Sequence, residues 1–571
     1  MGVSSVGKNL ARINGIFEII RGEREAELLI DNVKVLDVLG ETVASGSILL
    51  DQGEIVAINV KRDEVRVKEV FDGKGLFAIP GLIDAHFHFE SQLANPVALG
   101  DAMVPCGTTT CFVEFLDLIG SAGDQGIKAA RELFRDHDRL PYRLFAYAPG
   151  KKVSKEIALE LLDMEPVIGM GEFDHFTYSK GDEGCMELMA KARSKGMQVN
   201  GHWGLTTLSP LELNILPAIG GSNNHDVWNG DDIEKSLRYG FPTQIKFGVG
   251  KVENLLQALV NRKFPLENFM FCSDNLSVHH MRTKGHMDFF ISKAVAMGID
   301  PIKAIKLATY YTACHFHMED KLGSITPGRF GDIVLTDSLS VIDPLYVFKG
   351  GELVASEGRM LKQVSVDYSS MVQAGVPGLG SFSSGVLEDN VLEWSEDGSR
   401  AKVYLFDLFG RGHLNFYREI WLPVVDGKVV PVFEGQGLNR ISVVKRYGDD
   451  VTNGYFIGVH LDRGAVAVSF PAPVPYFIVI GNDIGEMFEA LVECDKYSGA
   501  GVVVGDGVIK AVLPIELYGM MSGASLGELE GASVAFDEAC GVLGHVNVGE
   551  PVINKLLSVF ISLHRFDFMK D

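Results

Sequence analysis

The sequence predicts an α/β protein whose central part is a (β/α)8 barrel of the TIM type. Between residues 80 and 323, short apolar runs alternate with amphipathic helical patterns, and this alternation indicates a parallel sheet. The segment holds about seven or eight such units, the number expected of a barrel. A doubly wound sheet is the competing architecture, but no GxGxxG sequence opens a helix after the first strand.

The barrel units can be followed in order along the chain. Strands are predicted at LFAIPGLIDAH, TTTCFVEF, YRLFAYAP, EPVIGMGEF, MQVNGHW and FMFCSD. Helical spacing of apolar residues lies between them at 156–164, 184–194, 232–239, 252–261 and 289–297. The carboxyl ends of parallel strands share one face of a barrel, and the loops on that face carry the chemistry of such enzymes.

Both flanks of the barrel have the character of β-structure. Strand-like runs separated by glycine turns occur before the barrel (ELLIDNVKVLD, SILLDQGEIVAI) and after it (ITPGRFGDIVL, VFKGGELVASEGRML). We therefore predict a small β-sandwich-like domain from 1–79 and 324–372, around a barrel at 80–323. A turn-rich stretch at 373–385 then precedes an α+β C-terminal domain at 386–571.

Composition restricts the class of protein and of partner. The 571 residues carry a net charge of −23, which argues against a nucleic-acid backbone as partner and allows a small uncharged or cationic substrate. The seven cysteines are odd in number, scattered and without a CxxC pair, as in a reduced cytoplasmic enzyme. No run of 18 apolar residues predicts a membrane span. We expect a soluble cytoplasmic protein that forms a homo-oligomer.

The motif that points to chemistry is His86-x-His88, in the run PGLIDAHFHFE. Residues two apart on a strand point to the same side, so both imidazoles can bind one metal ion at the end of a barrel strand. Two incidental histidines near a strand end are the alternative, because HxH by itself is a weak signal. The position of the motif and the residues that accompany it favour the metal site.

Four further strand ends close on residues of the types that bind metals. These residues are Glu172 after VIGMG, His202 after QVNG, His225 in SNNHD and Asp274 after FMFCS. Each has an ordinary alternative, since an acid after a strand often caps a helix and a histidine can lie in a turn. Their joint occurrence with His86 and His88 predicts a site for two divalent metals, with Glu172 bridging. Imidazole and carboxylate ligands without thiolates suit Mn, Fe(II) or Zn, and Cys106 and Cys272 are expected to be packed residues.

The order of these motifs resembles the adenine deaminase family of the amidohydrolase superfamily over nearly the whole chain. PGLIDAHFHFESQ and PCGTTT match the family's PGFIDAHxHIESS and the Thr-rich stretch that follows it. GMGE, GHWGL, NNHD, SDN and GHMD match the later barrel motifs GLGE, GHAPGL, SDHE, TDD and GHID. LPIELYGMMS, near the C-terminus, matches LPLPIAGLMS. The resemblance implies that a metal-activated water deaminates an aminopurine, most simply adenine to hypoxanthine and ammonia, as in purine salvage.

The departures from the family lie on the side where its substrate is expected. The family's TDPHEI becomes VEFLDL, which places Glu114 and Leu116 where it has Asp and His. Its IREGS becomes IKFGV, so Lys246 replaces an arginine, and its HDSHN run corresponds to PAPVPYF at 471–477. These changes leave the metal residues in place and leave the identity of the ring open.

In the implied mechanism, Asp274 accepts a proton from the water and passes it to the departing amine. Glu90, two residues past His88, is a candidate for binding a ring nitrogen or moving a proton, with a helix cap as the alternative. The alternative is a deaminase or a cyclic amidohydrolase that acts on another heterocycle, such as an N6-substituted purine, a pterin or a cyclic ureide. A non-catalytic protein that has kept the fold is the alternative from another class.

Several other residues near these motifs could line the site or only pack. Trp203 could stack on a flat heterocycle or fill the core. His279 and His280 follow Asp274 closely and are interpreted as exposed histidines, while His286 could support the site or open a helix. A second HxH, at His315 and His317, falls in a helical pattern where residues two apart diverge, so it is interpreted as structural.

Overall fold

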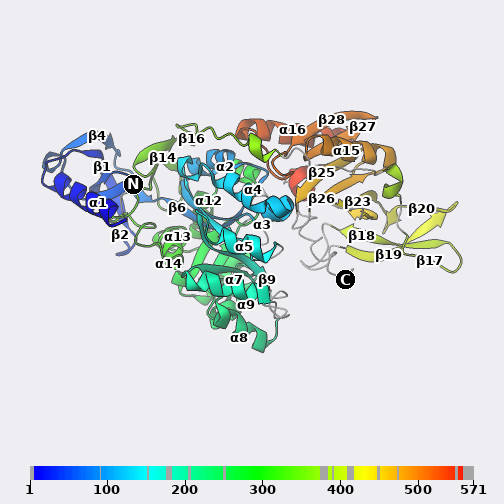
Figure 1. The fold of residues 1–571 in the computed structure, drawn as a ribbon, viewed down its shortest axis with the longest axis horizontal. Coiled ribbons are helices and arrows are strands. Elements are labelled where there is room, and N and C mark those ends of the chain that lie inside the picture. Colours follow the sequence, from blue (N-terminus) through cyan, green and yellow to red (C-terminus); the bar gives the residue numbers. More distant parts are fainter. Residues whose placement is uncertain are drawn as a thin grey trace.

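A computed structural model describes most of the chain. The described residues are 5–89, 92–150, 153–174, 183–203, 208–247, 252–372, 383–388, 391–407, 417–445, 451–471, 475–546 and 551–556. Figure 1 shows three parts in a row, with the barrel between the N-terminal strands and the C-terminal sheet. Within the described chain, every helix is too short or too polar to cross a membrane.

The predicted α/β barrel is confirmed. Its strands are β6 (Leu82–His88), β7 (Thr108–Glu114), β8 (Arg143–Ala148), β9 (Val167–Asp174), β10 (Gln198–His202), β11 (Thr243–Lys246) and β12 (Phe269–Cys272). β6 to β10 form one parallel sheet and β11 pairs with β12 in parallel. The position of an eighth strand is taken by 222–225, where Asn224 bridges Thr243 and Ser222 donates its N–H to Val199. The ring closes because Phe87 bridges Asp274.

Helices surround this barrel, and those at 155–161, 183–194, 230–238, 252–262 and 287–296 lie where the apolar spacing predicts them. They are α2 (Pro96–Met103), α3 (Leu116–Ala122), α4 (Gly126–Phe134), α5 (Lys155–Leu161), α7 (Glu183–Ser194), α8 (Pro210–Ile219), α9 (Gly230–Arg238), α10 (Val252–Arg262), α11 (Val278–Lys284), α12 (Met287–Ala296), α13 (Pro301–Leu307) and α14 (Tyr310–His315). Several begin at side chains that accept backbone N–H groups, such as Asn229 before α9 and Ser277 before α11. His279 and His280 thus lie in the first turn of a helix.

The two flanks of the barrel form one nine-stranded sheet. Its strands are β1 (Ala26–Asp37), β2 (Thr42–Asp51), β3 (Glu54–Ile58), β4 (Val67–Asp72), β5 (Phe77–Pro80), β13 (Ile333–Thr336), β14 (Pro344–Lys349), β15 (Glu352–Ser356) and β16 (Arg359–Met360). The sequence predicts a small β-sandwich-like domain from both flanks. In the structure all nine strands are connected, because β1 is long and irregular between Ile30 and Val33, pairing with β4 before that point and with β5 after it.

An N-terminal helix, α1 (Ser5–Ile20), covers part of this sheet and was not predicted. Its inner face packs Ile16 and Ile19 against Ala26, Leu29 and Leu49. Its outer face carries exposed apolar side chains as well, so the sequence lacks the clear polar face by which a surface helix is recognised.

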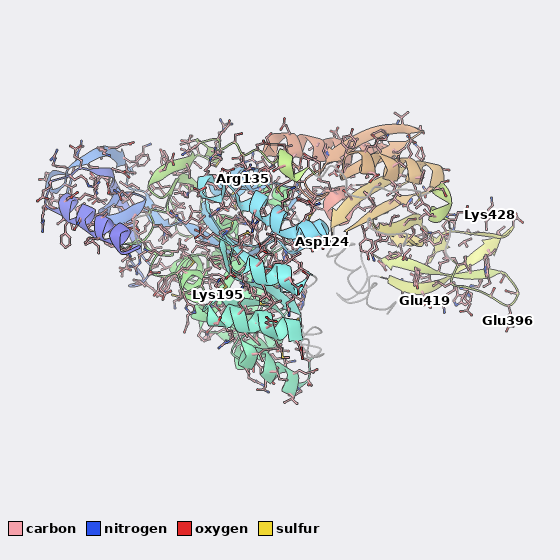
Figure 2. The ribbon with its side chains drawn as sticks, viewed as in Figure 1. Asp124, Arg135, Lys195, Glu396, Glu419 and Lys428 are labelled. Atoms are coloured by element: carbon pink, nitrogen blue, oxygen red, sulfur yellow. The ribbon has the colours of Figure 1, made fainter. Side chains whose placement is uncertain are left out.

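In the described residues, the C-terminal part contains a ten-stranded sheet on which helices α15 (Ile484–Lys496) and α16 (Leu526–Val542) pack, and residues 552–556 are also helical. Its strands are β17 (Glu393–Trp394), β18 (Arg400–Asp407), β19 (Tyr417–Val425), β20 (Lys428–Val429), β23 (Asn439–Lys445), β24 (Val451–Ile457), β25 (Ala465–Pro471), β26 (Pro475–Gly481), β27 (Ala500–Gly505) and β28 (Val508–Pro514). A small hairpin, β21 (Val432–Phe433) and β22 (Gln436–Gly437), lies apart from it. Helix α15 covers β25 and β27, and α16 lies on β28. Figure 2 places Glu396, Glu419 and Lys428 at the end of this part that faces away from the barrel.

A segment after β28 attaches the C-terminal part to the loop that follows the first barrel strand. The amide of Asn95 donates to the carbonyl oxygens of Ser522 (2.9 Å) and Ala524 (2.8 Å), while Ser522 donates its N–H to Leu93 (2.8 Å). The oxygen of Asn95 accepts the N–H groups of Val97 and Ala98 and so caps α2. One buried side chain therefore fixes both the start of a barrel helix and the contact with the C-terminal part.

Gly201, next to a predicted metal ligand, has no room for a side chain. A Cβ on Gly201 would lie 1.7 Å from Nε1 of Trp203, which is buried and donates to the Asn223 carbonyl. We expect Gly201→Ala to lower the free energy of unfolding by about 1–3 kcal/mol, because overpacking forces neighbours to move. Denaturant unfolding measures this. Gly531→Ala, on the exposed side of α16 with nothing nearby, is the control and should be neutral or stabilising. Equal stability of the two variants would contradict the packing argument.

Candidate active site

The six predicted metal ligands come together at the carboxyl ends of the barrel strands. His88 is the last residue of β6 and His86 lies two residues before it. Glu172 lies near the end of β9, and His202 ends β10. His225 follows the bridge residue Asn224, and Asp274 lies two residues after β12. Parallel strands bring their ends to one face, so residues nearly 190 positions apart become neighbours.

Glu172 is at the centre of this cluster. Its Oε1 lies 3.1 Å from His225 Nε2, 3.3 Å from His88 Nε2 and 3.4 Å from His86 Nε2. His202 Nδ1 is more distant, at 3.9 Å, but lies 3.1 Å from His225 Nε2. The four imidazoles therefore surround one carboxylate oxygen.

The donor atoms form two groups that share this carboxylate. One group is His86, His88 and Glu172, and the other is Glu172, His202 and His225; within each group the ligand atoms lie within 4.8 Å of one another. Asp274 joins the first group, with Oδ1 at 3.5 Å from His88 Nε2 and 3.9 Å from His86 Nε2. The other oxygen of Asp274, Oδ2, is turned toward Lys246.

These residues fit divalent metal ions in both chemistry and spacing. Ligands about 2.0–2.2 Å from a tetrahedral metal lie about 3.3–3.6 Å from each other, close to the separations around Glu172. Imidazoles and carboxylates are the donors that Mn, Fe(II) and Zn accept. In the described part of the chain, the groups with metal-ligand geometry contain no cysteine, and Cys272 is buried at the end of β12.

The charges of the cluster also favour a cation. Burial disfavours a charge on His88, but the hydrogen bond and the charge of Glu172 outweigh it and raise the pKa of His88 to about 10. Burial and the neighbouring His86 lower the pKa of His225 to about 3. The buried carboxylate of Glu172 thus stabilises a positive charge on its neighbours, and it would stabilise a bound metal ion in the same way.

Glu114, at the end of β7, is a buried acid beside this cluster that was not among the predicted site residues. Its Oε1 accepts the N–H of Glu172 (3.0 Å) and lies 3.8 Å from His86 Nδ1. Burial raises the pKa of Glu114 to about 7. A Cβ on Gly171 would lie 2.1 Å from Glu114 Oε2, so the glycine of GMGE makes space for this carboxyl group. The signal was present, because Glu114 is a polar residue that closes an apolar strand.

Two polar residues within the barrel hold the ligands in place. Asn200 Nδ2 lies 3.0 Å from His86 Nδ1, the ring nitrogen that faces away from Glu172. Asp84 accepts the N–H groups of His86 (3.2 Å) and Ser273 (3.1 Å), and lies 3.1 Å from His286. A metal-binding histidine is oriented by a partner at its other nitrogen, and its strand by contacts of this kind.

The remaining candidates have different outcomes. Trp203 is buried and stacks on Phe241 at 5.9 Å, so it packs in the core. His315 ends α14 and lies 2.9 Å from Asn223 Nδ2, whereas His317 lies outside the helix. Glu90 lies outside the described residues, as do residues 472–474 of the PAPVPYF run. The site roles of Glu90 and of the six ligands stay predictions.

Comparisons with known proteins match the chain on both sides of the turn-rich stretch. A family model described as the amidohydrolase family matches residues 77–367, and one described as the adenine deaminase C-terminal domain matches 416–562. Adenine deaminase of Desulforamulus reducens is 34% identical, covering 88% of this chain and 87% of the relative. Adenine deaminase of Kosmotoga olearia is 25% identical, covering 90% and 89%. A solved β-aspartyl dipeptidase from Fervidobacterium islandicum AW-1 is 18% identical, with a TM-score of 0.46, covering 60% of this chain and 100% of that one.

Proposed function

This chain belongs to the adenine deaminase family, and on that premise we propose that it hydrolyses adenine to hypoxanthine and ammonia. It is a hydrolase of C–N bonds in cyclic amidines, so the alternative of a non-catalytic protein is not retained. The observation that supports the proposal within the chain is the convergence of four histidines and two carboxylates on one face of the barrel.

We assign the metal ligands in two sets. His86, His88 and Asp274 would hold one divalent ion, His202 and His225 the other, and Glu172 would be shared by both. When bound, the ions lower the pKa of a water molecule so that a nucleophile exists near neutral pH. Mn, Fe(II) and Zn all suit the donor set.

Asp274 is placed to move the proton that the reaction requires. Its Oδ1 is directed to the ligand cluster and its Oδ2 to the space beside Lys246. Burial works against ionisation of Asp274, but the positive charges of Lys246 and of the neighbouring histidines together outweigh it and keep the pKa of the carboxyl group below its usual value. The carboxylate can therefore accept a proton from the attacking water and give it to the departing amine.

The test is ammonia release by the purified protein loaded with Mn, Fe(II) or Zn. Adenine should give equimolar ammonia and hypoxanthine. N6-substituted purines, pterins and cyclic ureides form the comparison panel, because Glu114 and Lys246 differ from the residues that the family usually has. Release of the substituted amine is measured for the N6-substituted purines and ring-opening for the cyclic ureides, because neither reaction yields ammonia. If a panel member has a higher kcat/KM than adenine, that compound would replace adenine as the proposed substrate. If no aminated ring releases ammonia, the proposal is refuted.

We further propose that the enzyme works in the cytoplasm in purine salvage, as a homo-oligomer. All seven cysteines are free thiols, which suits a reducing compartment. Hypoxanthine is a purine base that salvage enzymes can reuse, which gives the reaction a place in that process.

A further inference from the structure

Lys246 places a buried ammonium group beside the proton-carrying carboxylate. It is the last residue of β11 and pairs with Cys272 of β12, so it lies at the same barrel face as Asp274. Only 3% of its surface is exposed. Its Nζ lies 3.8 Å from Asp274 Oδ2, too far for a hydrogen bond, and it donates none to any other residue that the structure describes.

The side chain of Lys246 is held from one side by an indole ring. Its Nζ lies 4.3 Å from the centre of the Trp228 ring, and Trp228 Nε1 donates to Asp226 Oδ1 at 2.8 Å. Asp226 interacts electrostatically with both Lys246 and His202. Lys246 therefore has a defined position, with its ammonium group between the indole and the carboxylate that carries the proton.

A buried ammonium group without hydrogen-bond acceptors costs free energy, since its three donors have lost water. The contact with Trp228 and the ion pair with Asp274 compensate only in part, because neither accepts a hydrogen bond. The position next to Asp274 Oδ2 is where a substrate must come to receive a proton on its amine. An acceptor atom on the substrate would complete the coordination of Lys246.

We propose that Lys246 donates a hydrogen bond to the ring nitrogen adjacent to the amine-bearing carbon, and so selects substrates that carry an acceptor there. The inference rests on the proposed function. When the water oxygen bonds to that carbon, the electron pair of the carbon–nitrogen double bond moves onto the ring nitrogen. The nearby cation stabilises this pair. The pair returns as the bond to the amine breaks, and the amine leaves as ammonia with the proton carried by Asp274.

The test compares two ligands that cannot lose ammonia and that differ in one ring atom. They are 6-methylpurine and its 1-deaza counterpart, in which carbon replaces the ring nitrogen in question. Dissociation constants are measured by calorimetry on the metal-loaded protein. A charge-assisted hydrogen bond predicts that wild type binds the purine about 10- to 100-fold more tightly than the deaza compound.

In Lys246→Met, the ratio of the two dissociation constants (1-deaza compound over purine) should fall close to one. Lys246→Arg should keep most of the wild-type ratio. Lys306→Met is the matched control: Lys306 is also buried and ion-paired, with Glu41 at 2.7 Å, but lies in α13, and its loss should leave the ratio unchanged. General damage to the site would weaken both ligands equally and preserve the ratio.

Two outcomes overturn the inference. One is a wild-type ratio near one, which needs no variant and no folding control. The other is a ratio that survives in Lys246→Met. The proposed function fails separately, if the metal-loaded wild type releases no ammonia from adenine. The protein could fail that assay and still bind the purine more tightly than the deaza compound, with this preference lost in Lys246→Met. In that case the assignment of Lys246 as the hydrogen-bond donor to the ring nitrogen would stand.

Discussion

Asp274→Asn is expected to lower kcat for deamination by about 10²- to 10⁴-fold, the usual contribution of a positioned proton-transfer group. Asparagine has nearly the same shape and retains an oxygen for a metal, but its amide cannot accept and return a proton. The backbone also tolerates the change, because Asp274 has a φ of 54° and asparagine adopts this left-handed conformation readily. The effect should therefore report on chemistry rather than on folding.

Metal content and activity must be measured on the same Asp274→Asn sample. His86, His88 and Glu172 remain, so the bound metal should stay close to the wild-type amount. Asp232→Asn provides a matched control, because Asp232 is buried and accepts the N–H of Trp228, a role that the asparagine oxygen can take. Its kcat should stay within a few-fold of wild type. A metal-replete Asp274→Asn enzyme with kcat within tenfold of wild type would remove Asp274 from the proton path.

Glu172→Ala should have the second large effect, on metal binding itself. Glu172 Oε1 lies within 3.4 Å of three imidazole nitrogens, and no other carboxylate among the described residues lies as close to all three. Its removal should weaken metal binding by more than about 100-fold, since even partners that only orient a ligand contribute 10- to 100-fold. Activity should fall with the metal content, which we expect to be about two ions per wild-type chain.

Stability gives an independent measurement of the Glu172→Ala effect. A metal at 100 times its dissociation constant stabilises the folded protein by about 2.7 kcal/mol, so added Mn should raise the Tm of the wild type. This rise should disappear in Glu172→Ala. Glu160→Ala, which removes an exposed glutamate of α5 paired with Arg131, should keep the full rise and the full metal content. Retention of two ions by Glu172→Ala would refute the bridging assignment.

The barrel, and the clustering of the six predicted ligands at its carboxyl face, could be predicted because both depend on local patterns. Each strand is a short apolar run, and each predicted ligand is a polar residue at its end or within two residues of it, so periodicity places the ligand on the barrel face without knowledge of contacts. Glu172, His202 and Asp274 follow this rule. Glu114 follows it too, but as a departure from the family motif it was interpreted as a change in the surroundings of the site.

Other parts of the site depend on contacts that the sequence does not encode locally. Lys246 ends a short strand, and only the structure shows that its ammonium group is buried against Trp228 and faces Asp274. Asn200 is a polar residue within a buried strand, and its role depends on a histidine that lies 114 positions earlier. The sheet of the flanking domain depends likewise on an irregularity in β1 that periodicity cannot locate.

The bond between Asn95 and Ser522 joins residues 427 positions apart, and this separation sets an order of events during synthesis. A growing chain emerges from its N-terminus, so the barrel sequence is complete long before residue 522 exists. Until then the loop after the first barrel strand lacks the carbonyl groups that receive the Asn95 amide. Residues 522 and 524 lie in the last tenth of the chain, so this contact between the barrel and the C-terminal part can form only when synthesis is nearly complete.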